Sequence, residues 1–451
     1  GVRSGAVGDI EERPGNRGVV KANLLAKLAE HESAITSIAI PDDHSLLLTS
    51  SLDGSIRLWN PEMFFHSISV RSSARHKACD GGAVTSMVTI DNSKTFVYGT
   101  DQGTIEAVCV ENAPFSRVRM DKTSGEGAVC GISSALGSIS SSIIYATEGG
   151  RLRGVDLRMR KSTLAVSMHP DLGSITSLAM APDQSCPWMV VGTRKGYVSL
   201  WDLRFNVMSK LWRHQSQTPV RKLLIPSETI PGISEDRPVM FVAAGNNEVS
   251  IWDMLDSSCH SVYRSLPESA TETTAHAIPV LREIPICMNG AHESTSGFKT
   301  FPGRETHLDP SPGAISASLH GHSIASFIWT GRGLMGQSIS PFKLITGGSE
   351  KYIRVWETVR HQGSYTYQFG SGKNLDHLYD SFHGGSNGQT RVSTSQTIPS
   401  LRSRTTTEQN GNHQMASEYT EGNILDMKFL YRGNPLLMTG DAQGLLRVYR
   451  W

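Results

Sequence analysis

A histidine and an aspartate near the start of the chain have the residue types of half a catalytic triad. His31 and Asp53 are accompanied by hydroxyl side chains at Thr49 and Ser51. A carboxylate that orients an imidazole can make it a base that activates a hydroxyl nucleophile. The same residue types also form buried structural relays, because buried polar groups must be hydrogen-bonded. The place of these residues in a longer pattern has to decide between the two interpretations.

Other stretches that resemble catalytic or ligand-binding motifs are incomplete. The stretch FGSGKN (369–374) resembles a phosphate-binding loop, but Tyr367 replaces its first glycine and Asn374 replaces the Ser/Thr that would bind magnesium. The histidines of HGH (320–322) have no Cys/His neighbours at metal-ligand spacing. We find no nucleophile elbow and no distinctive carboxylate pair. The sequence therefore predicts no cofactor, no metal site and no enzyme activity in this chain, with a propeller enzyme kept as a third hypothesis.

The charge balance points to protein partners. The chain has 43 basic and 42 acidic side chains among 451 residues, a net charge of +1. It contains no block of like charge long enough to bind nucleic acid or an anionic membrane unaided. No apolar stretch approaches the roughly 18 residues that cross a bilayer, and the six cysteines form no Cys-x-x-Cys pair. We expect a cytoplasmic location, no nucleic acid and no direct membrane insertion.

A repeat of about 45 residues runs through the whole chain. Three positions before each anchor residue the side chain is aliphatic, as a strand with one buried face requires. Five positions before it, five units have glycine, which tolerates the positive φ of a tight turn. Nine positions before it the residue is small. The seven anchors are Trp59, Val108, Val155, Trp201, Trp252, Trp356 and Tyr449.

Each unit carries further apolar runs before the anchored one. In the first unit the runs are 34–40, 46–50 and 55–60. Three inner strands and one outer strand per unit are typical of WD-repeat β-propeller blades, which this chain resembles. We therefore predict an all-β, seven-bladed WD-repeat β-propeller. A strand at 24–30 is expected to close the ring by supplying the outer strand of the last blade.

The chain then divides into two parts. Residues 1–23 form an N-terminal lead or linker, and residues 24–451 form the propeller. Two insertions interrupt the propeller, at about 266–320 and 371–421. They are rich in Ser, Thr, Gly, Asn and His and poor in branched aliphatic residues, so we expect flexible or partly ordered loops.

The first unit has the complete polar set of a WD blade. We predict that His31, Thr49 (or Ser51), Asp53 and Trp59 form a structural relay, with the carboxylate accepting from the imidazole and the relay ending at the indole. Trp201, Trp252 and Trp356 are expected to anchor other blades. In the column of Asp53 the remaining units have other residues, so their relays should have decayed: Gln102, Gly149, Lys195, Asn246, Glu350 and Gln443.

Two consecutive units end their anchored strands with an Asp-x-Arg box. The boxes consist of Asp156 with Arg158 and Asp202 with Arg204. Paired boxes of this sort resemble those of WD-repeat substrate receptors for cullin-type ubiquitin ligases, whose arginines dock an adaptor. The alternative is that each Asp and Arg stabilise the turn that leaves the strand. Both interpretations remain open from the sequence.

Four segments resemble one WD-repeat family in particular: 31–60, GYVSLWDLRF (196–205), GNNEVSIWDM (245–254) and KLITGGSEKYIRVWE (343–357). This family is the C-terminal propeller of the protein-kinase-like regulatory subunit of the class III phosphatidylinositol 3-kinase complex. The resemblance implies a non-catalytic scaffold in vacuolar sorting and autophagy. Its implied partners are the lipid kinase catalytic subunit and Beclin-type and targeting coiled-coil subunits. It implies a position peripheral to endosomal and autophagic membranes through that complex. Glu350 departs from the aspartate that the family tends to carry.

Overall fold

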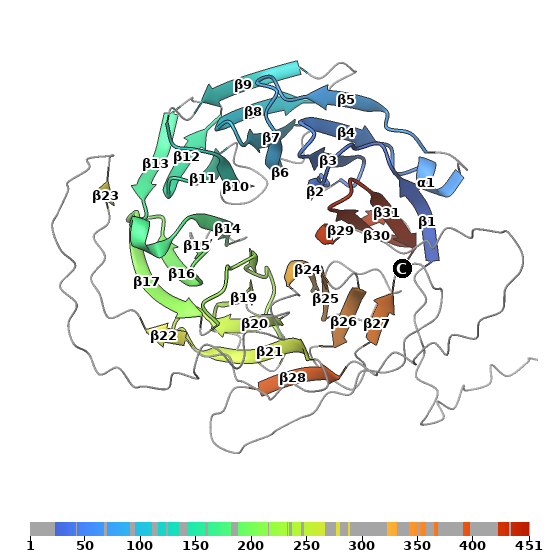
Figure 1. The fold of residues 1–451 in the computed structure, drawn as a ribbon. Helices are drawn as coiled ribbons and strands as arrows, with labels where there is room; N and C mark the ends of the chain where they lie inside the picture. The colour runs from blue at the N-terminus through green and yellow to red at the C-terminus, as the bar shows by residue number, and fades with distance from the viewer. Residues whose placement is uncertain are drawn as a thin grey trace, which may run out of the picture.

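Seven sheets surround a central axis in this computed structural model (Figure 1). The structure describes residues 23–266, 323–357 and 423–450, each with short gaps, and separate strands at 277–279, 287–288, 365–368 and 391–396. Each sheet is one blade whose first three strands follow one another in sequence from the axis outward. The predicted seven-bladed propeller is confirmed.

The first four blades are continuous in sequence. Blade 1 contains β2 (Ile35–Ala39), β3 (Leu47–Ser51), β4 (Ser55–Trp59) and β5 (Ala74–Lys77). Blade 2 contains β6 (Val84–Ile90), β7 (Thr95–Thr100), β8 (Thr104–Cys109) and β9 (Ser116–Lys122). Blade 3 contains β10 (Val129–Ser134), β11 (Ser142–Thr147), β12 (Arg151–Asp156) and β13 (Lys161–Ser167). Blade 4 contains β14 (Ile175–Met180), β15 (Trp188–Thr193), β16 (Tyr197–Asp202) and β17 (Val207–His214).

The other three blades include the two insertions. Blade 5 contains β18 (Lys222–Leu224), β19 (Val239–Ala243), β20 (Glu248–Asp253) and β21 (Cys259–Leu266). Blade 6 contains β24 (Ile324–Thr330), β25 (Lys343–Gly348), β26 (Tyr352–Glu357) and β27 (Tyr365–Gln368). Blade 7 contains β29 (Ile424–Arg432), β30 (Asn434–Asp441) and β31 (Leu446–Arg450).

The ring closes through blade 7. The strand β1 (Asn23–Leu28) pairs antiparallel with β31, and Leu28 stands opposite Leu446. Segments from the two ends of the described chain therefore share one sheet (Figure 1). The predicted closing strand is confirmed, and it covers an edge that would otherwise offer unpaired backbone groups to another sheet.

The core lies between blades. Seven hydrophobic clusters each join two neighbouring blades, and the anchor side chains Trp59, Trp201, Trp252 and Trp356 are buried. The small-residue column is explained by this packing: a Cβ added at Gly440 would lie 2.5 Å from Ile35 Cγ2 of the next blade. Each blade thus depends on its neighbours for burial of its apolar faces.

Three strands from the insertions extend the outer edges of consecutive blades. The short strands β22 (Ala277–Pro279) and β23 (Cys287–Met288) pair antiparallel with β17 and β13. The strand β28 (Arg391–Gln396) pairs in parallel with β21, outside blade 5 (Figure 1). These strands do not follow from the residue pattern of the insertions. They use the free hydrogen-bonding groups of blade edges, which any extended backbone can pair with.

Candidate functional site

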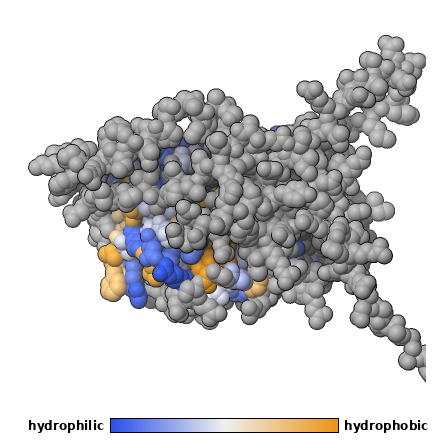
Figure 2. All heavy atoms as spheres, turned by 90° about the horizontal axis from the view of Figure 1, so that it is seen from below, coloured by the Kyte–Doolittle hydropathy of each residue, from blue (hydrophilic) through white to orange (hydrophobic). Residues whose placement is uncertain are grey.

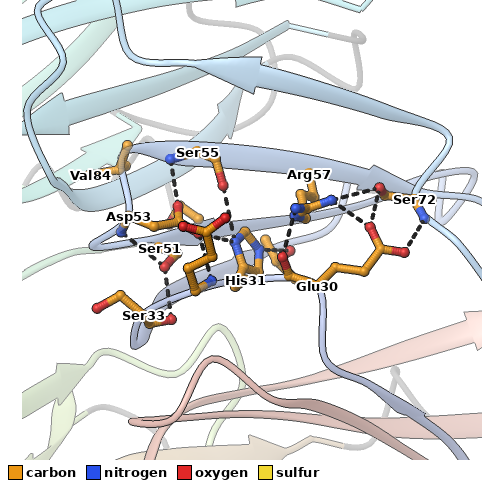
Figure 3. Close-up of polar contacts among 12 residues, drawn as sticks. Glu30, His31, Ser33, Ser51, Asp53, Ser55, Arg57, Ser72 and Val84 are labelled. Carbon is orange, nitrogen blue, oxygen red and sulfur yellow. Dashed lines mark hydrogen bonds and ion pairs between the residues drawn. The ribbon is translucent and has the colours of Figure 1, made fainter.

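The relay of blade 1 joins three segments of the chain (Figure 3). Trp59 Nε1 donates to Thr49 Oγ1 at 2.9 Å, and Thr49 Oγ1 lies 2.8 Å from His31 Nε2. On the other side of the ring, His31 Nδ1 lies 3.3 Å from Asp53 Oδ2 and 3.2 Å from Ser55 Oγ. The structure thus brings together His31, Thr49, Asp53 and Trp59. Ser55 also takes part, and Ser51 instead accepts from the backbone N–H of Asp53.

Proton positions in this relay follow from its donors and acceptors. The indole can only donate, so the Thr49 hydroxyl donates onward to Nε2, and the proton of a neutral His31 sits on Nδ1 facing Asp53. Burial lowers the pKa of His31, which outweighs the opposing effect of Asp53. Burial raises the pKa of Asp53, but hydrogen bonds from Ser55 and from the backbone N–H of Glu32 outweigh it and lower the pKa overall.

The same geometry argues against a catalytic triad in blade 1. A triad needs a hydroxyl that can reach a substrate, whereas Thr49 is fully buried and its oxygen already accepts from Trp59. The carboxylate of Asp53 is also held by two backbone N–H groups, those of Glu32 at 3.0 Å and Ser55 at 2.7 Å. Each member of the relay is occupied by another part of the blade. The arrangement stabilises the blade and leaves no reactive group exposed.

A second polar cluster beside the relay was missed by the sequence analysis. Arg57 donates from Nη1 to Glu30 Oε2 at 2.5 Å and from Nη2 to the Glu30 carbonyl at 2.6 Å (Figure 3). Ser72 donates its hydroxyl to the same carboxylate at 2.6 Å and its N–H at 3.0 Å. This cluster ties the segment before β2 to β4 and to the segment before β5. Glu30 and Ser72 lie outside the repeat columns, so the repeat did not point to them.

The other anchor tryptophans use two different acceptors, whereas the buried indole nitrogens of Trp212 and Trp329 have none among the described residues. Trp356 Nε1 donates to Thr346 Oγ1 at 3.0 Å, and Thr346 occupies the column of Thr49. In blades 4 and 5 that column holds valine, and a serine two residues before the tryptophan replaces the lost acceptor. The bonds run from Trp201 to Ser199 at 2.9 Å and from Trp252 to Ser250 at 2.7 Å.

Polar contacts in several other blades have changed rather than disappeared. Asp80 and Glu126 precede an inner strand, as His31 does, and the other residues concerned lie within or at the ends of strands. Each has a partner of different chemistry from that in blade 1. The expectation of simple decay is therefore corrected for these blades. The contacts are Thr100 to Asp80 at 2.7 Å, Arg153 to Glu126 at 2.7 Å, His214 to Glu248 at 3.1 Å and Arg447 to Asp441 at 2.7 Å.

A charge pair with a buried carboxylate and a partly exposed ammonium links four blades beside the central channel. Lys222 Nζ of blade 5 donates to Asp426 Oδ1 of blade 7 at 2.7 Å and to Ser326 Oγ of blade 6 at 2.7 Å. Asp426 Oδ2 accepts from the backbone N–H of Ile38 in blade 1 at 2.8 Å. Lys222 and Asp426 replace the small residues of one column, which are Ser37, Ser86, Gly131, Ser177 and Ser326 elsewhere. We call this contact the channel clasp.

The channel clasp contributes to closing the ring. Burial raises the pKa of Asp426, but the charges of Lys222 and Lys428 and the bonds to its oxygens outweigh it and lower the pKa overall. The carboxylate is therefore an anion, and it holds the first and last inner strands together. Lys222 and Asp426 are the two charged residues in a column of small residues, and their charges are opposite. The sequence shows this difference, but only the fold shows that the two side chains pair across blade 6.

Comparisons with known proteins agree with this architecture. A family model described as WD domain, G-beta repeat matches residues 22–60. The serine/threonine-protein kinase VPS15 of Arabidopsis thaliana is 29% identical over 259 residues, covering 53% of this chain and 17% of that protein. The VPS15 kinase of Saccharomyces cerevisiae is 24% identical over 299 residues, covering 62% of this chain and 20% of that protein. These matches support a WD-repeat propeller similar to that of the VPS15 kinases, called VPS15-type below.

The VPS15-type propeller also resembles a solved structure. The WD40 propeller domain of Doa1 aligns with a TM-score of 0.54 over 95% of this chain and 96% of that chain, at 12% identity, and supports the fold alone. A VPS15 kinase of Dictyostelium discoideum is 25% identical over 195 residues, covering 41% of this chain and 10% of that protein. The aligned part of the chain spans a fifth or less of the length of these curated relatives.

The Asp-x-Arg boxes of the VPS15-type propeller do not form a shared site in the described residues. Arg204 donates from Nε to Asp202 Oδ1 at 3.1 Å and from Nη2 to Asp202 Oδ2 at 2.6 Å, within its own turn. Asp156 ends β12, and Arg158 lies outside the described residues. The comparisons do not favour a cullin-ligase receptor, and the Arg204 geometry fits the turn-stabilising interpretation.

Searches for metal sites and membrane spans gave negative results within the described ranges. Those ranges contain no group of three or more His, Cys, Asp or Glu side chains that could hold a metal ion. They also contain no helix long and apolar enough to cross a membrane. The FGSGKN and HGH motifs, and Glu350, fall outside the described residues.

Proposed function

We propose that the chain is a non-catalytic protein-interaction scaffold, the propeller of the protein-kinase-like regulatory subunit of the class III phosphatidylinositol 3-kinase complex. The observation that supports this most is its similarity to VPS15 kinases of several species across much of the propeller. In this role the propeller helps hold the lipid kinase catalytic subunit together with Beclin-type and targeting coiled-coil subunits. It acts in autophagy and endosomal sorting, in the cytoplasm and peripheral to the membranes concerned.

The chemistry of the blades supports a scaffold. The polar groups that resemble catalytic ones are buried and bonded to each other, as in the relay from Trp59 through Thr49 to His31. Buried, satisfied networks of this kind make a unique rigid fold. A rigid disc held by seven inter-blade clusters presents its loops at fixed positions, which suits simultaneous binding of several proteins.

A candidate contact surface lies on the turns that follow the anchored strands of blades 4 and 5. Phe205 and Leu255 occupy equivalent turns of these blades and are 68% and 43% exposed. The guanidinium of Arg204 lies 5.6 Å from the centre of the Phe205 ring. Exposed aromatic and arginine side chains are common at protein-binding hot spots. Hydrophobic and hydrophilic side chains lie side by side on the described surface seen from below (Figure 2).

We assign this surface to an amphipathic helix of a coiled-coil partner. Such a helix would bury an apolar stripe on Phe205 and Leu255, and acidic residues beside the stripe would pair with Arg204. Equivalent turns of neighbouring blades point to one rim of the disc, because the strands that lead into them run in the same direction. One helix lying along that rim could therefore reach both side chains.

Co-purification tests the proposal. Full-length protein expressed in cells should bring down the class III lipid kinase catalytic subunit and a Beclin-type subunit, identified by mass spectrometry. Absence of the catalytic subunit from the purified complex would refute the assembly role. Phe205→Asp and Leu255→Asp together should reduce recovery of the coiled-coil subunit, since they place charges in the apolar contact.

A matched control uses the opposite rim. Leu52 is 45% exposed in the turn between β3 and β4, at the other end of the strands from the turns of Phe205 and Leu255. Leu52→Asp should leave recovery of the coiled-coil subunit unchanged. Equal losses for both sets of variants would mean that the contact surface is assigned wrongly.

A further inference from the structure

The innermost strands of the propeller surround a channel that contains unusual charges. Its volume is about 530 Å³, and residues from the inner strands of all seven blades line it. Among the described lining residues the charged side chains are Arg221, Lys222, Lys428 and Asp426. Three cations face one carboxylate, so the lining carries an excess of two positive charges. The remaining lining residues are uncharged apart from His44, which can titrate.

Lys428 is the first of the cations without a carboxylate of its own. The channel clasp already joins Asp426 to Lys222 at 2.7 Å. Burial within the ring lowers the pKa of Lys428, and the neighbouring charge of Lys222 lowers it further, while Asp426 offsets part of this. Its side chain nevertheless reaches the water of the channel. The corresponding residues of the other blades are uncharged: Ala39, Val88, Ser133, Ala179, Leu224 and Ile328.

Arg221 is the second such cation, and it also differs from the residues at the equivalent position of other blades. In blades 1, 2 and 4 the same position holds a threonine whose hydroxyl donates to a carbonyl of the next blade, at 2.8, 2.5 and 2.6 Å. Arg221 is exposed and lines the channel, and no side-chain ion pair is formed by it within the described residues. Its side chain is therefore available to an anion from solution.

The two cations line the same channel, at different depths along its axis. Arg221 directly precedes β18 and follows the buried Val220, whereas Lys428 lies four residues after Ile424, which opens β29. Three residues along parallel inner strands correspond to about 10 Å. Both side chains are long, and Lys222 lies between them along the axis. A channel with low-dielectric walls also concentrates the field of its charges.

We propose that the central channel binds a phosphate-bearing small molecule, with Arg221 and Lys428 as the side chains that contact it. A guanidinium matches two oxygens of a phosphate, and an ammonium acts as a point charge on a further oxygen. A dianion neutralises the two excess charges. The volume is larger than one phosphate needs, so the phosphate can be carried on a small organic scaffold. Bound there, it bridges blades 5 and 7 across blade 6.

Titration calorimetry in low-salt, phosphate-free buffer tests this site with two probes, inositol hexakisphosphate and inorganic phosphate. The wild-type chain should bind the first probe at one site. Lys428→Met and Arg221→Met should each weaken binding by about tenfold or more, because each removes a charged hydrogen-bond donor. Lys77→Met, on the exposed outer strand of blade 1, should leave the affinity unchanged.

The outcomes distinguish a site for one phosphate group from a site for a polyphosphorylated ligand, and loss of binding from loss of folding. Binding of both probes would support a site for a single phosphate group, and binding of the first alone would support a polyphosphorylated ligand. Absence of binding by both probes, or equal affinity of wild type and both channel variants, would overturn the proposal. Folding has its own measurement: without phosphate, Lys428→Met should raise the melting temperature, because burial and the charge of Lys222 disfavour this cation more than Asp426 favours it. A lower melting temperature would contradict the assignment of Lys428.

Discussion

Blades 1 and 5 bury the same anchor residue with different polar chemistry. In blade 1 the indole of Trp59 bonds to Thr49 on the neighbouring strand, and Thr49 in turn contacts His31. In blade 5 the indole of Trp252 bonds to Ser250 on its own strand. The first arrangement connects three segments of a blade, whereas the second satisfies one donor locally.

Blade 5 compensates through packing around its tryptophan. The ring of Trp252 lies 6.4 Å from that of Trp212 and 5.7 Å from that of His214. Aromatic contacts of this kind stabilise beyond their buried area. His214 lies 3.1 Å from Glu248, so a buried polar contact persists in blade 5 but is separated from the indole. The comparison teaches that the propeller requires a satisfied indole in these blades but not one particular relay.

The largest effect is expected from Thr49→Val. This change keeps the shape but leaves the indole of Trp59 and Nε2 of His31 without a partner, and each buried loss costs about 1–3 kcal/mol. The free energy of unfolding, measured by urea titration, should fall by about 2–4 kcal/mol. Thr346→Val in blade 6 is the matched control, since Trp356 alone is bonded there. Equal losses for the two variants would mean that His31 adds nothing to the relay.

Asp53→Ala should have the next largest effect. It removes the acceptor of His31 and of the backbone N–H groups of Glu32 and Ser55, so unfolding should require about 2–3 kcal/mol less free energy. The melting temperature should fall without loss of partner binding. Asp53→Asn retains one oxygen and should recover part of the stability. An unchanged melting temperature for Asp53→Ala would show that the relay is wrong.

Ser250→Ala should cost less, about 1–2 kcal/mol, because one buried indole donor loses its acceptor and no second group depends on it. Combined with Thr49→Val, its effect on the free energy of unfolding should be additive, since the two sites share no partner. A coupling well above the experimental error would show that blades 1 and 5 are not independent.

The smallest effect is a pH dependence from blade 1. The pKa of His31 is lowered on folding, so its contribution is complete above the unfolded value near 6.5 and is lost as the pH falls below it. The slope cannot exceed about 1.4 kcal/mol per pH unit for one group. Asp53, whose pKa is also lowered, adds a loss only below about pH 4. His31→Gln should flatten the stability profile just below pH 6.5, and an unchanged slope would contradict this assignment.

Repeated local chemistry was predictable from the sequence. The anchor spacing gave the blades, and the glycine column predicted turns in which Gly54, Gly103 and Gly196 have φ between 74° and 80°. A complete relay was predictable in blade 1 because His31 and Asp53 keep the residue types of the repeat. Buried anchors and tight turns recur at a fixed period in every blade, so the chain contains several examples of each.

Compensating changes were not predictable in the same way. The indole acceptor moves from a neighbouring strand to Ser250, and the carboxylate of Glu248 has meaning only with His214 nearby. The channel clasp joins Lys222 and Asp426 across blade 6, at a distance that no repeat period describes. The edge strands β22, β23 and β28 depend on backbone pairing, which leaves little trace in side-chain pattern.

The closing strand has a consequence for synthesis of the protein. Leu28 pairs with Leu446, so β1 emerges from the ribosome long before its partner β31 exists. At about 5–20 residues per second the wait is roughly 20–80 s. During that time blades 1 to 6 can form in order, and β1 can pack against blade 1, but its backbone groups that pair with β31 have no strand partner. The ring of blades can therefore close only after β31 has been synthesised and has paired with β1.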